Sequence, residues 1–444
     1  MYADDLILLS ESETGLQKCL DKLNSYTKQW KLKINIKKTK IMIFQKGGHL
    51  TKTIFRLGDQ IVEKTKEYKY LGTIITYTGN FKLNEVKLKK KGQKASYLIS
   101  KNIGLHAKPS TSIKIFEKIV EPILMYNCEI SHAYMPKTWN YEKFKNKLWE
   151  TGGEVNKVVL SFLRQLLGLH KKSPTLTILA ETGKYPLSLK IFTHIIKYWI
   201  RLHTTENSLL IAAKNANLAQ ERKGNQNWLK LTGYLLKYSN ISSQPSKNAA
   251  NNNKLIKSFK QKMKKEYETW WRGKMQPEGS TKFDFFYKYK KTFEFEDYLD
   301  NIPRHIRLHT TRLRTSSHNL PVETMRYADP KPDRKDRKCR ICNMDKVGDE
   351  HHYLLECSNF SILDVRKKFM DEIKKTNKQL ESFDDRNIID YCMVLNDKSI
   401  QEPMTKFIKQ VLTAFKEEQS DDKPSLPTVT RSGRTVKAPQ KLNL

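Results

Sequence analysis

The chain has 444 residues, enough for about two to four domains, and its 82 Lys and Arg against 47 Asp and Glu give a formal net charge of +35. With 38% hydrophobic and 10% aromatic residues it is globular, and the excess of positive charge indicates a polyanionic partner such as nucleic acid, although a lysine-rich compositional bias is the alternative. Six unevenly placed cysteines are too few for a disulfide scaffold, and the acidic N-terminus is unlike a secretory signal. The apolar runs are well short of the ~20 residues that span a bilayer. We therefore expect an intracellular protein, nuclear or cytoplasmic.

Residues 1–80 predict an α+β unit. A strand is expected at 2–9, and an amphipathic helix follows it, with Ser10 and Glu13 at the spacing of a capping box. A second strand is expected at 39–44. Residues 53–76 then read as strands broken by the turn pair Gly58-Asp59.

Helices are expected from 81 to 240, because apolar residues recur with helical periodicity in 157–169 and 189–202. The stretch 82–118 holds ten lysines and two glutamates. Within it, the basic helix expected at 89–108 is either a nucleic-acid-binding surface or a solvated lysine face. The candidate contacts in it are Lys89, Lys90, Lys91 and Lys94.

The C-terminal half divides into three segments. Residues 241–300 combine a polar linker with a basic-aromatic run, in which Trp270 and Trp271 either stack on unpaired bases or, more commonly for such a pair, pack in a core. Residues 301–417 contain a cysteine–histidine cluster and a helical tail. Residues 418–444 form a basic tail that we expect to be disordered.

Asp4 and Asp5 stand side by side in an apolar run. Adjacent carboxylates repel each other, and a divalent cation relieves that repulsion. In two-metal phosphoryl transfer, carboxylates hold two Mg²⁺ ions roughly 4 Å apart. A turn with solvated acids is the alternative for a tetrapeptide as short as Tyr-x-Asp-Asp.

Three stretches in order carry a resemblance to a known family: YADDLILLS (2–10), WKLKINIKKTKIMIF (30–44) and EYKYLGTIIT (67–76). They resemble the final palm motifs of reverse transcriptases of the non-LTR (LINE-like) retrotransposon class. The resemblance implies that Asp4 and Asp5 are catalytic Mg²⁺ ligands in the motif that also contains Tyr2. It further implies nucleotide or primer contacts from the two later motifs, which contain Asn35, Lys38 and Thr39, and Tyr70, Leu71 and Gly72.

More loosely, 114–130 and 166–187 resemble the thumb and post-thumb region of these elements, in which we expect Tyr126, Cys128 and Glu129 to be packed core residues. The fold class implied is α+β: a truncated reverse-transcriptase palm with antiparallel strands, then a mostly helical thumb and connection, then a small zinc knuckle. An organellar-intron maturase shares the Tyr-x-Asp-Asp palm but seldom carries such a knuckle.

A polymerase of this type needs a third aspartate and fingers upstream of the Tyr-x-Asp-Asp motif. We therefore expect the chain to be the C-terminal part of an RNA-directed DNA polymerase, inactive alone, whose parent reaction uses Mg²⁺. The alternative is a non-catalytic, zinc-dependent RNA- or DNA-binding protein derived from such an element. In either case the expected partners are nucleic acids, as template–primer and target site.

The stretch CRICNMDKVGDEHHYLLEC (339–357) has the spacing of a zinc site. Cys339 and Cys342 form a Cys-x₂-Cys turn, and His352 and Cys357 supply the other two ligands, with His351 less favoured because it gives a five-residue gap. A chance grouping of three cysteines is the alternative. The stretch also resembles the Cys-Cys-His-Cys knuckle of non-LTR retrotransposon proteins, which implies nucleic-acid contacts from the basic residues nearby: Lys335, Arg337, Lys338 and Arg340.

Overall fold

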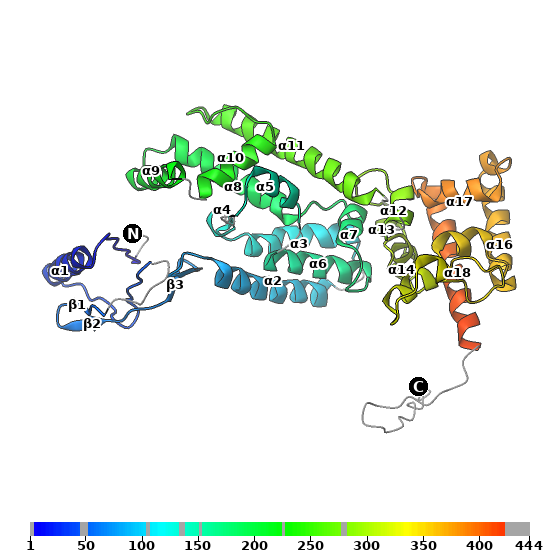
Figure 1. The fold of residues 1–444 in the computed structure, drawn as a ribbon, viewed down its shortest axis with the longest axis horizontal. Coiled ribbons are helices and arrows are strands. Elements are labelled where there is room, and N and C mark those ends of the chain that lie inside the picture. The colour runs from blue at the N-terminus through cyan, green and yellow to red at the C-terminus, as the bar shows by residue number, and fades with distance from the viewer. Residues whose placement is uncertain are drawn as a thin grey trace, which may run out of the picture. The chain divides into compact units, whose positions relative to one another are not determined.

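The computed structural model describes residues 4–44, 52–103, 107–132, 138–150, 153–223, 227–276 and 282–421. The chain divides into two compact units, and both are mostly helical (Figure 1). Tyr2 and the tail from residue 422 onward lie outside the described residues. No helix in the described part of the chain is both long and apolar enough to cross a bilayer. Unit 1 comprises 1–94, 121–155 and 190–256, and unit 2 comprises 95–120, 156–189 and 257–444.

Unit 1 begins with helix α1 (Glu13–Gln29), which packs on the antiparallel hairpin β1 (Phe55–Leu57) and β2 (Gln60–Val62). The expected turn at Gly58-Asp59 connects the two strands, and Gly58 has a φ of 59°. Ser12, not Ser10, caps α1, because its Oγ accepts a hydrogen bond from the Gly15 amide at 3.1 Å. The side chains that form the small core between helix and hairpin are Leu20, Ile41, Phe55, Leu57 and Val62.

Two expected strands are not formed as predicted. Residues 6–10 form no helix or strand, and Leu6, Ile7 and Leu9 are exposed. The stretch 39–44 is reduced to a single parallel bridge between Ile41 and Lys64. A strand is stable only when a neighbour satisfies its backbone, and the apolar sequence alone does not supply that neighbour.

The second hairpin of unit 1 joins β3 (Glu67–Tyr70) and β4 (Thr73–Thr76), with Glu67 opposite Thr76 and Tyr70 opposite Thr73. The helices that follow are α4 (Cys128–Ser131), α5 (Tyr141–Lys147), α9 (Ser208–Arg222) and α10 (Trp228–Tyr238). Five more helices have residues in both units: α2 (Lys82–Ile103), α3 (Pro109–Leu124), α6 (Glu154–Leu167), α8 (Leu187–Thr204) and α11 (Ala249–Met275).

Helix α11 begins inside the stretch that reads as a linker. The Asn248 side chain accepts a hydrogen bond from the Ala250 amide at 2.8 Å, which starts the helix at this polar run. Further along α11, Trp271 is buried and its ring meets Phe293 edge-on at 5.4 Å. Trp271 is therefore a core residue and is not available to stack on bases.

Unit 2 contains three long helices that lie together in its C-terminal part: α18 (Lys398–Asp421) packs against both α14 (Arg304–Arg314) and α16 (Phe360–Thr376), as Figure 1 shows. Helices α16 and α18 therefore lie in the stretch after the cysteine cluster. The short helices of this unit are α7 (Thr175–Glu181), α12 (Asp284–Tyr289), α13 (Tyr298–Asn301), α15 (Pro321–Thr324) and α17 (Asp385–Met393), with 3₁₀ turns at Met325–Tyr327, Arg334–Asp336 and Lys378–Leu380.

Candidate functional site

Cys339, Cys342, His352 and Cys357 come together in unit 2. Each offers one donor atom, and these four atoms lie within 4.8 Å of one another. The Cys342 Sγ lies 3.3 Å from the His352 Nε2. His352 and Cys357 are buried, whereas the first two cysteines are partly exposed.

A short hairpin presents the first two cysteines. Lys338 and Val347 form an antiparallel bridge, and the Cys339 amide donates to the Lys346 carbonyl at 2.8 Å. Gly348 closes this hairpin where a Cβ would lie 2.8 Å from the Pro321 Cγ, so a side chain at this position displaces its neighbours.

A single turn of π-helix, His352–Glu356, places the other two ligands. The Cys357 amide donates to the His352 carbonyl at 2.7 Å, and the two side chains lie on the same side of the turn. The Asp349 carboxylate accepts from the His352 amide at 3.0 Å. Glu356 lies near the imidazole, with its Oε2 3.8 Å from the His352 Nδ1, on the nitrogen that does not face the cysteines.

Arg366 ties this cluster to helix α16. Its guanidinium is buried and donates to the carbonyls of Leu354 at 3.0 Å and Cys357 at 3.3 Å. Burial lowers the pKa of this arginine. Sequence spacing gave no sign of Arg366, because its partners are backbone carbonyls and not side chains with a recognisable pattern.

Cys339 and Cys357 share a hydrogen bond that favours the thiolate form of Cys339. The hydrogen bond between Cys357 and Cys339 lowers the pKa of Cys339 to about 3, and the same bond raises the pKa of Cys357. The Tyr353 hydroxyl lies 3.2 Å from the Cys339 Sγ. Donor atoms around a tetrahedral Zn²⁺ are about 3.3–3.8 Å apart, so this arrangement of sulfur and imidazole donors fits zinc.

His351 lies outside the group of four donors. Its Nδ1 is 3.6 Å from the Glu356 Oε1, and its side chain lines a neighbouring polar pocket. The cations that line that pocket are paired with acids: Lys282 and Arg326 with Glu323, Lys288 with Asp390, and Arg334 with Asp349.

The polymerase-like residues lie in unit 1. Asp4 and Asp5 are exposed, and their adjacent carboxylates are of the oxygen-donor type that Mg²⁺ prefers. Asn35 organises the following motif, because its side chain accepts from the Lys38 amide at 3.2 Å and its carbonyl accepts from the Thr39 amide at 3.0 Å.

The hairpin β3–β4 carries the third motif, and Tyr70 ends its first strand. Leu71 has a φ of 42° and Gly72 a φ of 83°, the pair of left-handed residues that defines a type I′ turn. The Tyr126 hydroxyl donates to the Leu71 carbonyl at 2.6 Å, and the Lys87 ammonium donates to the Gly72 carbonyl at 3.1 Å.

The exposure of Tyr126 and its hydrogen bond to Leu71 correct the expectation that Tyr126 is a packed core residue. Its side chain is 49% exposed, and its hydroxyl holds the tip of the hairpin. The next residue, Asn127, donates to the Thr73 hydroxyl at 3.2 Å. Tyr68 links the hairpin to the preceding motif by donating to the Lys38 carbonyl at 3.1 Å.

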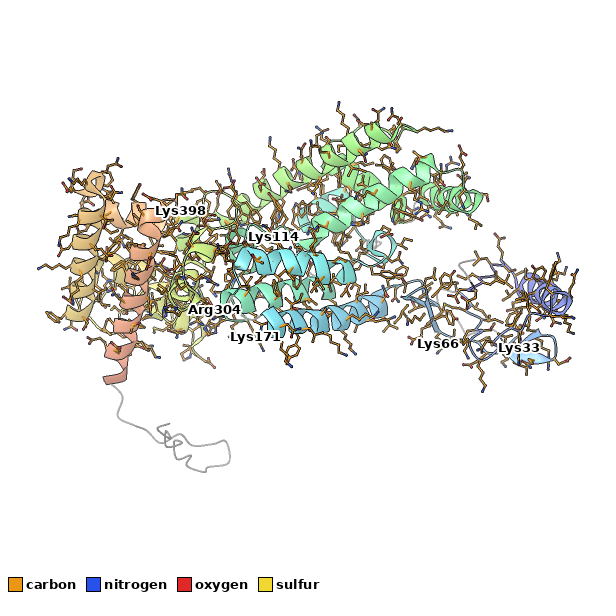
Figure 2. The ribbon with its side chains drawn as sticks, turned by 180° about the vertical axis from the view of Figure 1, so that it is seen from behind. Lys33, Lys66, Lys114, Lys171, Arg304 and Lys398 are labelled. Atoms are coloured by element: carbon orange, nitrogen blue, oxygen red, sulfur yellow. The ribbon has the colours of Figure 1, made fainter. Side chains whose placement is uncertain are left out.

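The lysines predicted to contact nucleic acid differ in whether an acidic side chain of the protein already pairs with them. Lys90, Lys91 and Lys94 of α2 are exposed, whereas Lys89 pairs with Glu154 at 2.6 Å. Basic side chains occur along much of the chain, and Figure 2 labels examples from Lys33 to Lys398.

Near the cysteine cluster, Lys335 and Arg340 are exposed and Lys338 pairs with Asp345 at 3.2 Å. Arg337 is buried, and it donates to the carbonyls of Val322 at 3.0 Å and Pro332 at 3.2 Å. Arg337 therefore stabilises the fold, and its buried guanidinium is not placed to contact a phosphate.

Comparison with known proteins bears on the N-terminal part. Residues 1–75 match the family model described as reverse transcriptase (RNA-dependent DNA polymerase). No curated protein and no solved structure matches the chain. The matched range contains both aspartates, the Asn35 turn and most of the β3–β4 hairpin. The similarity to reverse transcriptases thus covers residues 1–75 of the 444-residue chain.

Proposed function

We propose that this protein is a reverse transcriptase relative of the non-LTR retrotransposon class that binds RNA or DNA with the help of a zinc ion. The ligands of that ion are Cys339, Cys342, His352 and Cys357. The observation that carries the proposal is the convergence of these four donors, two of them buried, at mutual distances within 4.8 Å.

Zinc binding would hold the cluster in place, because the hairpin that carries Cys339 and the π-helical turn that carries His352 are too short to be stable alone. Lys335 and Arg340 are exposed beside the ligands and are suited to phosphate oxygens. The net charge of +35 supports an extended polyanionic partner.

The neighbouring histidines provide a matched test of the zinc site. In the purified full chain, His352→Ala should lower the zinc content by one ion and weaken binding to a fluorescent RNA or DNA oligonucleotide. His351→Ala should retain the zinc and the affinity, because His351 lies outside the donor group. Equal zinc content in the wild type and both variants contradicts the proposal.

A second candidate activity is RNA-directed DNA synthesis, which is favoured by the family match across Asp4 and Asp5 and by the exposure of both carboxylates. Mg²⁺ held there would activate the primer hydroxyl and stabilise the leaving pyrophosphate. Primer extension on an RNA template tests it, with the Asp4→Asn and Asp5→Asn double variant as the control. Mg²⁺-dependent incorporation that the double variant abolishes supports polymerase activity, and no incorporation leaves nucleic-acid binding as the function.

A further inference from the structure

A second group of metal-binding side chains lies in unit 1, away from both motifs discussed so far. Cys128 and Glu129 belong to helix α4, and His194 belongs to helix α8 (both helices are labelled in Figure 1). The Cys128 sulfur, a Glu129 carboxylate oxygen and a His194 ring nitrogen all lie within 4.8 Å of one another.

The local fold holds these two helices in place. Asn127, with a φ of 55°, interrupts the chain before α4 and sets the direction of the short helix. The Trp228 indole of α10 donates to the Glu129 carbonyl at 2.7 Å. Tyr198, one helical turn after His194 on α8, meets the Trp228 ring edge-on at 5.5 Å. The three donors therefore meet on a supported framework and not on a free loop.

We propose that Cys128, Glu129 and His194 bind a zinc ion, with the fourth position open to water or to a ligand. One thiolate, one carboxylate and one imidazole are all zinc donors, and three protein ligands with an open position are typical of non-structural zinc sites. Cys128 is fully buried, Glu129 is partly exposed and His194 is exposed, so the sulfur is the deepest of the three donors and the open position would face solvent.

A buried cysteine by itself does not explain this arrangement, as Cys392 shows. Cys392 in α17 is equally buried, yet within the part of the chain that the structure describes it belongs to no group of three donors. Cys128 differs from it in having both a carboxylate and an imidazole at coordinating range.

The site also has a structural consequence for the β3–β4 hairpin. Tyr126 and Asn127, which hold the hairpin tip, come directly before Cys128 in the chain. A metal bound between α4 and α8 would fix the anchor of that tip and make the hairpin more rigid.

Zinc content of the purified full chain tests the site separately from the Cys339 cluster. We expect two zinc ions in the wild type and in Cys392→Ser, and one each in Cys128→Ser and in the double variant Cys339→Ser and Cys342→Ser, which keeps only two ligands of that cluster. The variant that combines all three substitutions should hold none. If Cys128→Ser retains the wild-type zinc content while the double variant loses one ion, this site is refuted and the proposed function stands.

Two further measurements guard against misfolding of the variants. Glu129→Gln and His194→Gln alter residues that are not buried and should also lose one zinc ion, with circular dichroism spectra like the wild type. In a background that carries Cys339→Ser, Cys342→Ser and Cys357→Ser, Co²⁺ should give a thiolate-to-cobalt charge-transfer band that disappears when Cys128→Ser is added. Persistence of that band, or full zinc retention by both glutamine variants, overturns the assignment.

Discussion

The left-handed backbone at Leu71 and Gly72 determines which side chains the tip of the β3–β4 hairpin can accept. Both residues have positive φ, and a Cβ on Gly72 would lie 3.3 Å from the Tyr126 ring. A residue with a side chain is strained at this φ, and the tyrosine that would have to move is the one that holds the hairpin tip.

Gly72→Ala should therefore destabilise the chain by about 1–2 kcal/mol. Gly233 is a matched control, because it lies inside the exposed face of α10 and a Cβ there meets nothing within 4 Å. Gly233→Ala should stabilise by about 0.5–1 kcal/mol. Urea unfolding measures both, and a change of the same sign for the two variants contradicts this account.

His132, at the end of α4, gives a pH-dependent contribution to stability. Burial lowers its pKa from 6.5 to about 4, and its Nε2 lies 3.7 Å from the Glu85 carboxylate. The pKa of Glu85 is itself raised, by burial and then by Glu154. Below pH 6.5 the unfolded chain binds a proton that the folded chain does not take up until about pH 4, so stability falls as the pH falls through this window.

His132→Gln should remove that loss, which amounts to about 2–3 kcal/mol at pH 4.5. The measurement is the free energy of unfolding between pH 7 and pH 4.5 in excess chelator, so that metal release does not contribute. His170→Gln, at an exposed histidine, should follow the wild-type curve. Parallel curves for wild type and His132→Gln contradict the assignment.

At the residue scale, sequence reasoning succeeds where side chains act on side chains at fixed spacing. The gap between His352 and Cys357 singled out the histidine that the structure places with the cysteines. It could not find Tyr126 or Arg366, since both donate to backbone carbonyls, and any residue provides a carbonyl. For Cys128 and Glu129 the third donor, His194, comes from a separate helix, and only the fold brings it near.

Among the elements, helices were easier to predict than strands for a physical reason. Helix periodicity is local, and the tail after the cysteine cluster forms α16, α17 and α18. The stretch 2–9 has the composition of a strand, but pairing depends on distant segments, and residues 6–10 form no strand in the described chain. The polar run at the start of α11 reads as a linker in the sequence, but it begins a helix, because the Asn248 side chain caps it.

Helix α14 is fastened by a buried ion cluster. Arg314 donates to Glu181 of α7 at 2.8 Å and lies 3.3 Å from Glu296, and all three side chains are largely excluded from water. Burial alone would lower the pKa of Arg314, but the charges of Glu181 and Glu296 outweigh it and raise that pKa.

Arg314→Met should destabilise the chain by about 3–5 kcal/mol, because it leaves the buried Glu181 carboxylate without its cation, whereas Glu296 keeps its pair with Lys290. Arg386→Met, at an exposed position of α17, serves as the control and should change stability by less than about 0.5 kcal/mol. Thermal or urea unfolding reports both values. A loss below about 1 kcal/mol for Arg314→Met would show that the Glu181 carboxylate protonates or rearranges at little cost.

For the whole molecule, the net charge of +35 concerns partners and not the fold, and its effect on binding depends on which cations are free. Arg337 shows the distinction, since its guanidinium donates to backbone carbonyls within the protein and is not available to a phosphate. On α2, Lys89 is paired with Glu154, whereas Lys90, Lys91 and Lys94 are exposed.

The triple variant Lys90→Gln, Lys91→Gln and Lys94→Gln should therefore weaken binding to a DNA duplex and reduce the slope of log K against log salt by about 2 to 3, because each phosphate contact releases counterions. Lys89→Gln is the matched control, and we expect it to leave the slope unchanged while removing the pair with Glu154. Fluorescence anisotropy over a salt series measures both slopes. If the triple variant keeps the wild-type slope, the basic stretch of α2 is a solvated face and the phosphate contacts come from elsewhere.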